Sequence, residues 1–259
     1  MSLNFCFIGA GNLATRLSTA LVKNGFSVIQ VFSRTERSAK VLAEKVNSSY
    51  TISVKDIDKV ADIYVVALTD GVVDTILSKI DIQNKLLIHC AGSMPLSILK
   101  KYSSNIGVLY PLQTFSRDRE IDFENIPVFV EANTSENEEI ILSVARKIST
   151  NVSILDSDKR QLLHVSAVFA CNFVNYFYTI AADLLESEDI PFEVLKPLIM
   201  ETAQKVITME PKYSQTGPAV RFDENVMKKH LDLLKDNKVY QELYMSVSKG
   251  IFDFHKKLE

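Results

Sequence analysis

The chain has 259 residues, of which 47% are hydrophobic and 24% are charged, and its formal net charge is −3. This length accommodates one large domain or two, and the composition is typical of a globular protein. Because the net charge is small and negative and no long Lys/Arg block occurs, the chain lacks the positive field that recruits nucleic acid. No nucleic-acid partner is therefore expected.

Short apolar runs alternate with amphipathic helical patterns as far as about residue 155. The predicted strands cover residues 3–8, 28–32, 50–53, 62–68, 85–89, 107–110, 128–131 and 152–155. The predicted helices between them cover residues 12–24, 36–46, 71–79 and 136–149. This alternation predicts an α/β fold, with a Rossmann-type doubly wound parallel sheet that forms a nucleotide-binding domain over residues 1–155.

The first predicted strand runs directly into the sequence Gly9-Ala-Gly-Asn-Leu-Ala14, and the first helix follows at once. Gly9 permits a tight turn, Gly11 lets a pyrophosphate approach the backbone, and Ala14 lets the helix pack closely on the strand. The free N–H groups at the start of the helix then face the phosphates. This stretch predicts a dinucleotide site.

The second predicted strand ends in Ser33-Arg34-Thr35. A site for NAD or S-adenosylmethionine normally has an acidic residue there, which binds the ribose hydroxyls, and none is present. A guanidinium flanked by hydroxyls suits the 2′-phosphate of NADP, whereas the alternative is a solvated loop arginine. Together with the glycine turn, Arg34 predicts NADP as the cofactor and argues against a methyltransferase.

Three further strand ends carry polar residues at the edge where a doubly wound sheet binds its ligands. Leu68-Thr69-Asp70 follows the fourth strand. Leu68 and Thr69 are candidate cofactor contacts, but the interpretation that we favour for the Thr and Asp is that they cap the next helix. His89–Ser93 follows the fifth strand, and Tyr110–Phe115 follows the sixth. Ser93 and Gln113 are therefore candidate secondary substrate contacts. The alternative for Gln113 is that its side chain only hydrogen-bonds the backbone of its own loop. The predicted cofactor contacts are Gly9, Gly11, Asn12, Leu13, Ala14, Ser33, Arg34, Thr35, Leu68 and Thr69.

The C-terminal part predicts a second, all-helical domain over residues 156–259 for substrate binding and dimerisation. Its predicted helices cover residues 158–188, 192–209, 224–234 and 239–257. The uncharged segment 162–182 is long enough to span a bilayer, but His164, Asn172 and Asn175 would be costly in lipid. We therefore expect a buried helix in a soluble protein, with no membrane partner.

Most polar residues of this uncharged helix fall on one stripe. At 100° per residue they lie within about 80° of one another, Ser166 excepted: Gln161, His164, Asn172, Asn175 and Thr179. Buried polar groups need partners, so the stripe faces a cleft and its ligand, or it hydrogen-bonds another helix or subunit.

His164 is the best candidate for a general acid, because an ordinary imidazole pKa of ~6.5 allows proton exchange near neutrality. Asn172 would line the substrate beside it. His89 is a second candidate for the acid, although its place in a strand favours burial.

The sequence lacks the motifs of several other enzyme classes. No Tyr is followed four positions later by Lys, no G-x-S-x-G occurs, and no His/Cys cluster has metal-ligand spacing. What remains is hydride transfer to or from a small-molecule substrate, in which the cofactor carries the chemistry. The separate Cys6, Cys90 and Cys171 indicate free thiols, and strand sequence from about Leu3 leaves no room for a secretory signal, so we expect a cytoplasmic protein.

Several motifs together resemble the NADP oxidoreductases of the 6-phosphogluconate-dehydrogenase-like superfamily. More narrowly, the chain resembles the pyrroline-5-carboxylate-reductase-like group with a C-terminal domain of unknown function. The likeness spans essentially the whole chain and rests on these segments in this order: residues 8–14, Ser33-Arg34-Thr35, His89–Ser93, Tyr110–Phe115, Val168–Phe173 and Thr216–Arg221.

The resemblance implies a Rossmann domain, a helical C-terminal domain, NADP(H) as cofactor and a homodimer formed through the helices, but no established substrate. Tyr110 stands where the group is expected to have His. Val168 stands where hydroxyacid dehydrogenases have a Lys four positions before an Asn, here Asn172. Imine reduction therefore fits better than alcohol oxidation with a Lys acid/base.

The missing lysine also leaves a rival hypothesis, a non-catalytic NADP-binding sensor or interaction protein. Turnover of NADPH with imines or 2-keto acids would distinguish an enzyme from such a sensor. The loop Thr216–Arg221 is a further candidate contact, in which Arg221 binds a substrate carboxylate or forms a structural ion pair.

Overall fold

The computed structural model describes residues 3–82, 84–116, 119 and 121–257. The chain divides into two compact units, Met1–Cys171 and Asn172–Glu259, and each is described by itself. The sequence predicts a domain boundary at residues 155–156, where the last strand joins the following helix. This position is earlier in the chain than the division after Cys171. The units divide within that helical segment, whose first turn is joined to the sheet by bonds from Ser157 and Arg160 to Glu131.

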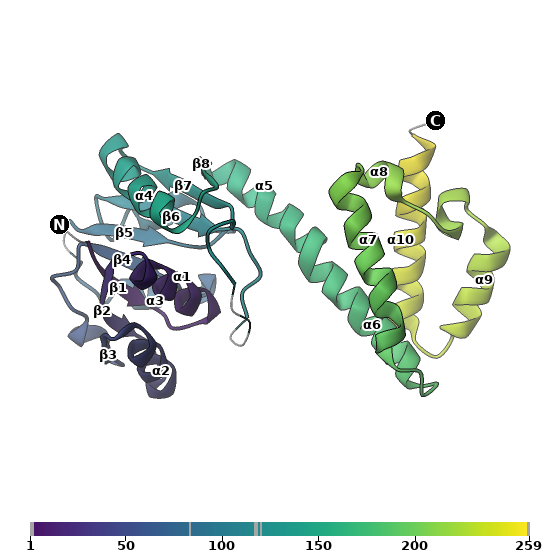
Figure 1. The fold of residues 1–259 in the computed structure, drawn as a ribbon, viewed down its shortest axis with the longest axis horizontal. Coiled ribbons are helices and arrows are strands. Elements are labelled where there is room, and N and C mark those ends of the chain that lie inside the picture. The colour runs from purple at the N-terminus through teal and green to yellow at the C-terminus, as the bar shows by residue number, and fades with distance from the viewer. Residues whose placement is uncertain (1–2, 83, 117–118, 120, 258–259) are drawn as a thin grey trace. The chain divides into compact units, whose positions relative to one another are not determined.

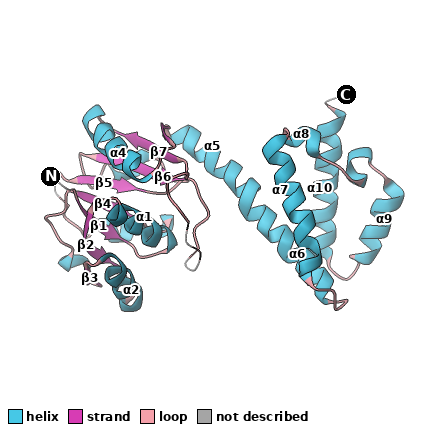
Figure 2. Ribbon diagram, in the orientation of Figure 1, coloured by secondary structure: helices cyan, strands magenta, loops and turns pink. Residues whose placement is uncertain are grey.

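The first unit contains an eight-stranded sheet in the order β3-β2-β1-β4-β5-β6-β7-β8 (Figure 1). Its strands are β1 Asn4–Ile8, β2 Ser27–Phe32, β3 Ser49–Thr51, β4 Ile63–Val66, β5 Leu86–His89, β6 Ile106–Pro111, β7 Val128–Ala132 and β8 Val152–Ile154. The associated α-helices, cyan in Figure 2, are α1 Asn12–Lys23, α2 Glu36–Val46, α3 Asp70–Leu77, α4 Ser135–Ile148 and α5 Ser157–Ala167. Short 3-10 turns occur at Val54–Asp56 and Leu96–Leu99.

The predicted doubly wound sheet is confirmed, with one departure from the parallel arrangement. Strands β1 to β6 run parallel, but β7 is antiparallel to β6, and β8 then pairs parallel with β7. A parallel neighbour needs a crossover, usually through a helix. The connection over residues 112–127 has no helix in its described part, and it returns the chain in the opposite direction.

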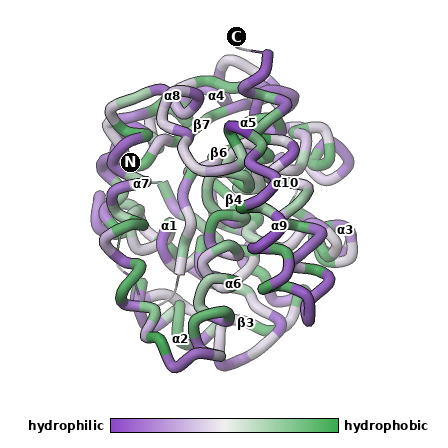
Figure 3. The backbone as a smooth tube through the Cα atoms, turned by 90° about the vertical axis from the view of Figure 1, so that its right-hand side faces the viewer, coloured by the Kyte–Doolittle hydropathy of each residue, from purple (hydrophilic) through white to green (hydrophobic). Residues whose placement is uncertain are grey.

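The core lies on both faces of the sheet because successive strand side chains point to opposite faces. In β1, Phe5 and Phe7 join a buried cluster with residues of α1, α2 and α4, whereas Cys6 and Ile8 join a second cluster with residues of α3. Burial on both faces explains why the strands read as continuous apolar runs. Figure 3 colours the backbone by hydropathy, with hydrophobic residues in green and hydrophilic residues in purple.

The second unit consists of helices and their connections, with no strand among its described residues, as predicted. Its α-helices are α6 Val174–Glu186, α7 Lys196–Thr208, α8 Pro211–Ser214, α9 Glu224–Leu233 and α10 Lys238–Lys256. Two 3-10 turns, Phe192–Leu195 and Pro218–Arg221, accompany them. The short helix α8 and the second of these turns lie between the predicted helices 192–209 and 224–234, where the sequence predicts no helix.

The long helix predicted over residues 158–188 is α5 and α6 joined by a π-helical segment, Val168–Phe173. Within the described residues, Ser157–Glu186 is the one helix with the length and apolar composition of a membrane span. The expected burial of this helix is wrong for the single chain, because none of its most apolar window is buried. Phe169 is 64% exposed and Leu162 is 69% exposed.

Candidate cofactor and proton-donor site

The glycine turn after β1 packs closely against the ends of β2 and β4. Gly9 has φ +122°, and a Cβ at this position would lie 2.2 Å from the Ala67 carbonyl oxygen at the end of β4. Its N–H donates to the Phe32 carbonyl, 2.9 Å away at the end of β2. Only glycine satisfies both the left-handed φ and this close approach, so the predicted turn is required by the packing.

The start of α1 is open. Gly11 occupies the N-cap position, no side chain caps the helix, and its first turn contains no acidic residue. In the same unit, Thr134 and Asp156 cap α4 and α5 with their side chains. A Cβ at Gly11 would meet nothing within 4 Å. Free N–H groups, a positive helix end and open space fit a pyrophosphate.

The remaining predicted residues of the turn differ in exposure. Asn12 is exposed, and its Nδ2 donates to the Phe115 carbonyl at 3.0 Å, which ties the loop after β6 to the start of α1. Leu13 is half-buried and Ala14 is fully buried against the sheet. Ala14 thus has the packing role that the sequence predicts.

The residues after β2 lie at the same edge of the sheet. Ser33 is half-buried, and Arg34 and Thr35 are exposed. The Thr35 N–H donates weakly to Ser33 Oγ at 3.5 Å, and Thr35 begins α2 without a side-chain cap. The Arg34 guanidinium forms no ion pair with any described residue, which leaves it available for an anion.

The residues after β4 begin α3. Leu68 is half-buried, and Thr69 is exposed at the N-cap position but makes no capping hydrogen bond. Thr69 therefore occupies the N-cap position that we favoured, but its side chain does not form the expected hydrogen bond to the helix N–H groups. The Asp70 carboxylate instead accepts a hydrogen bond of 2.6 Å from Ser93 Oγ, which joins the ends of β4 and β5.

His89 is completely buried in β5. Its Nδ1 accepts a hydrogen bond from the Ala91 N–H at 3.2 Å. Burial, and after it the charge of Arg160, lowers the pKa of His89 to about 3, against a smaller opposing contribution from the Pro95 carbonyl. His89 therefore remains neutral at physiological pH, in agreement with the burial that its strand position favours.

His164, the predicted general acid, lies against the turn that follows β5. A Cβ at Gly92 would be 2.6 Å from its Nδ1, so this turn admits the imidazole only because residue 92 is glycine. The same Nδ1 is 3.1 Å from the hydroxyl of Tyr110 on β6, and the two rings meet edge to face with centroids 6.2 Å apart. The structure thus brings His164 and Tyr110 together at the carboxyl ends of β5 and β6.

Two predicted substrate contacts are not part of this group. Gln113 is exposed, and its Oε1 accepts from the N–H of Thr114 at 2.8 Å, as the loop-backbone alternative predicts. Asn172 is exposed and is the first residue of the second unit. Its role beside the substrate stays a prediction.

The π-helical segment also changes the predicted polar stripe. The angular argument assumes 100° per residue throughout, but Val168–Phe173 has π-helical geometry. This segment lies between His164 and Asn175, so the two residues do not keep the register of a regular α-helix. The assumption of one continuous polar face is therefore wrong.

A buried ion pair that the sequence analysis missed anchors α5 to the sheet. Arg160 is completely buried, pairs with Glu131 on β7, and donates from Nη2 to the Met94 carbonyl at 2.7 Å. Ser157 Oγ bonds both Glu131 carboxylate oxygens and accepts from the Leu96 N–H at 2.9 Å. In the sequence Arg160 looks like any charge on a helix surface, so no signal identified it.

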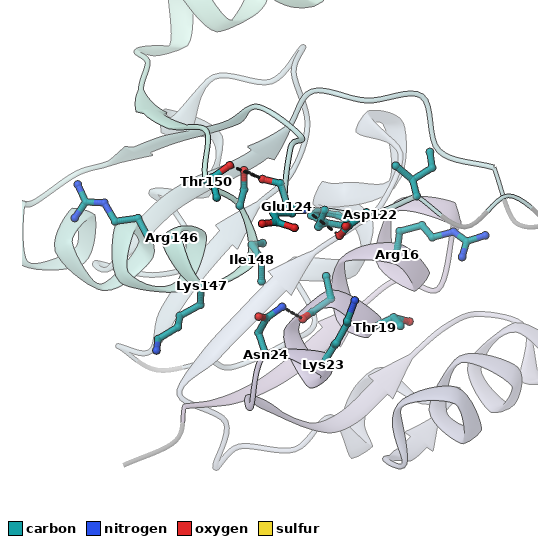
Figure 4. Close-up of a pocket in the computed structure, with 14 residues that line it drawn as sticks. Arg16, Thr19, Lys23, Asn24, Asp122, Glu124, Arg146, Lys147, Ile148 and Thr150 are labelled. Carbon is teal, nitrogen blue, oxygen red and sulfur yellow. Dashed lines mark hydrogen bonds between the residues drawn. The ribbon is translucent and has the colours of Figure 1, made fainter.

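A different hollow of about 380 Å³ lies between the second half of α1, residues 121–124 and the end of α4 (Figure 4). In the close-up, Arg16 and Arg146 point away from each other, and Glu124 lies between Asp122 and Thr150. None of the predicted site residues lines this hollow. Among the described residues, no group of His, Cys, Asp or Glu is arranged to hold a metal ion.

A Rossmann sheet, an uncapped helix start beside a glycine turn, and an imidazole at the strand ends define a dinucleotide-binding oxidoreductase. Residues 4–93 match the family described as NADP oxidoreductase coenzyme F420-dependent, and residues 126–251 match a domain of unknown function, DUF2520. A "putative NADP oxidoreductase" from Bacteroides fragilis is 44% identical, with 97% of this chain and 98% of that chain covered and a TM-score of 0.94. The chain belongs to this family of NADP oxidoreductases.

More distant solved structures share the fold. An imine reductase from Myxococcus stipitatus in complex with NADP+ is 17% identical over 98% of this chain and 93% of that chain, with a TM-score of 0.69. A pyrroline-5-carboxylate reductase from Coxiella burnetii is 17% identical over 100% and 99% of the two chains, with a TM-score of 0.56. No match was found among curated proteins. The predicted family and enzyme class, with NADP as the cofactor that the family carries, are confirmed.

Proposed function

We propose that this protein is an NADPH-dependent reductase of a small substrate with a C=N or C=O bond. The observation that carries the proposal is the pairing of His164 with Tyr110, beside Gly92, at the strand ends where a Rossmann sheet presents its ligands. The fold shared with the imine reductase and the pyrroline-5-carboxylate reductase supports C=N reduction in particular.

The residues of the first unit divide the binding of the cofactor between them. The glycine turn and the first N–H groups of α1 would hold the pyrophosphate, and Ser33, Arg34 and Thr35 would hold the 2′-phosphate. Thr69 and Leu68 would lie along the dinucleotide at the end of β4. Bound NADPH supplies the hydride.

His164 would supply the proton that reduction also requires. Hydride adds to the carbon of the C=N or C=O bond, and a proton leaves an N–H of the protonated imidazole for the nitrogen or oxygen, whose former π electrons form the new bond, and the donor ring becomes neutral. Solvent then returns a proton to the ring. Val168 occupies the place where a hydroxyacid dehydrogenase would have its lysine, so the proton donor has to come from elsewhere.

The test is turnover with defined probes. We expect NADPH absorbance to fall when the protein is mixed with 1-pyrroline, pyrroline-5-carboxylate or cyclohexanone plus allylamine, and His164→Asn to lower the rate about a hundredfold or more with NADPH binding retained. His230→Asn, a change to a histidine of the second unit that bonds Tyr244, is the control. Binding of NADPH without turnover on any probe would favour the sensor hypothesis instead.

A further inference from the structure

We propose that Tyr110 is a positioning residue for His164, which directs proton exchange with the substrate to the Nε2 atom of the imidazole. Tyr110 is the penultimate residue of β6, and only 6% of the residue is exposed. Its hydroxyl has one hydrogen-bond partner among the described residues, Nδ1 of His164 at 3.1 Å. No described residue bonds Nε2, so Nδ1 is occupied by the phenol and Nε2 is left for a ligand.

The donor and acceptor roles follow from burial. A buried phenol needs an acceptor for its proton, and the only one within reach in the described structure is the Nδ1 lone pair of a neutral imidazole. The hydrogen of that imidazole then resides on Nε2. Burial also raises the pKa of Tyr110, although the charge of Arg160 opposes this, so the phenol keeps its proton at physiological pH.

The same contact serves the charged form of the ring. A hydroxyl both donates and accepts, so when Nδ1 is protonated the Tyr110 oxygen accepts from it. In both states Tyr110 holds Nδ1 and Gly92 packs against the ring, which leaves one nitrogen to exchange a proton. In the protonated ring, the Nε2–H bond breaks towards the substrate, its electron pair stays on the ring, which becomes neutral with its remaining proton on Nδ1, and solvent restores the positive charge.

The first experiment does not depend on catalysis. In ¹⁵N spectra of the neutral imidazole, with His164→Asn used for assignment, we expect an unprotonated, hydrogen-bonded Nδ1 and a protonated Nε2. Tyr110→Phe removes only the hydroxyl, so the Nδ1 resonance should move towards that of a free ring nitrogen. Gly92→Ala, which crowds the ring at 2.6 Å, should produce the same change by displacing His164 from the phenol. A protonated Nδ1 in the neutral ring, or an unchanged resonance in Tyr110→Phe, would overturn the proposal.

The second experiment is kinetic and rests on the proposed function. With 1-pyrroline as probe, Tyr110→Phe should lower kcat about tenfold to a hundredfold while KM and NADPH affinity stay unchanged. Tyr64→Phe is the matched control, because Tyr64 is also a buried strand tyrosine and its hydroxyl donates to the Asp58 carbonyl at 2.8 Å. Equal losses in both variants would reduce Tyr110 to a structural role. Absence of turnover in the unmodified protein would contradict the proposed function alone, because the spectra still test the contact.

Discussion

Arg34 is the residue on which the choice between the two nicotinamide cofactors depends. It is exposed at the end of β2, between Ser33 and Thr35, and it forms no ion pair with any described residue. A guanidinium with free donors binds a phosphate through charge-assisted hydrogen bonds, and NADH offers no phosphate at this position.

We therefore predict that Arg34→Ala weakens NADPH binding about tenfold to a hundredfold and leaves NADH binding nearly unchanged. Fluorescence titration with each cofactor measures the two affinities. Lys40→Ala, which removes an exposed charge further along α2, is the control for a general loss of positive field. Equal losses for both cofactors in Arg34→Ala would contradict a 2′-phosphate contact.

The element that positions the proposed proton donor is α5. Its first turn is capped by Asp156 and held to the sheet by Arg160, which is buried against Glu131 and the Met94 carbonyl. His164 follows Arg160 by one helical turn, so the anchor and the imidazole lie along the same helix. The ion pair thus connects β7 and the turn after β5 to the site.

Breaking that anchor should be costly, because it leaves a buried guanidinium without its carboxylate. We predict that Glu131→Gln lowers the free energy of unfolding by about 3 kcal/mol, measured by urea denaturation. Lys159→Ala breaks the neighbouring ion pair between Lys159, whose side chain is 72% exposed, and Asp156, whose side chain is 53% exposed. Because this pair is solvated, the variant should lower the free energy of unfolding by less than about 1 kcal/mol. Similar values for the two variants would show that the buried pair contributes little.

At the scale of the whole molecule, the single chain leaves apolar helix surface uncovered. On α7, Met200 is 68% exposed and Ile207 is 75% exposed, and a spacing of seven residues places them on one face. The most apolar window of Ser157–Glu186 is likewise unburied. Exposed apolar helix surface is typical of a protein–protein interface. We propose that a second copy covers it, which gives the homodimer expected from the family resemblance.

The dimer proposal is tested by measuring mass in solution. We expect the protein to elute as a dimer in size-exclusion chromatography with light scattering, and the double variant Met200→Glu/Ile207→Glu to elute as a monomer. Val41→Glu changes an equally apolar position on α2 that is 60% exposed, and it should leave the dimer intact. A monomeric unmodified protein, or a dimeric double variant, would refute this interface.

Local patterns were enough to predict the elements and the cofactor half of the site. The range of α2 is as predicted, α1 ends one residue before its predicted end, and Gly9 and Gly11 lie in the turn that their spacing indicates. These features depend on interactions between residues near one another in the chain. The sequence carries such interactions as hydrophobic period, capping residues and glycine spacing.

What only the tertiary structure decided depends on residues far apart in the chain. The reversal of β7, the buried pair of Arg160 with Glu131, and the contact between Tyr110 and His164 each join segments that no local pattern connects. The π-helical segment broke a stripe that regular helix geometry predicted. The sequence by itself therefore determined the fold class, the family and the identity of the cofactor, and it predicted where the cofactor binds. The partner of the imidazole became visible only when the sheet brought β5, β6 and α5 together.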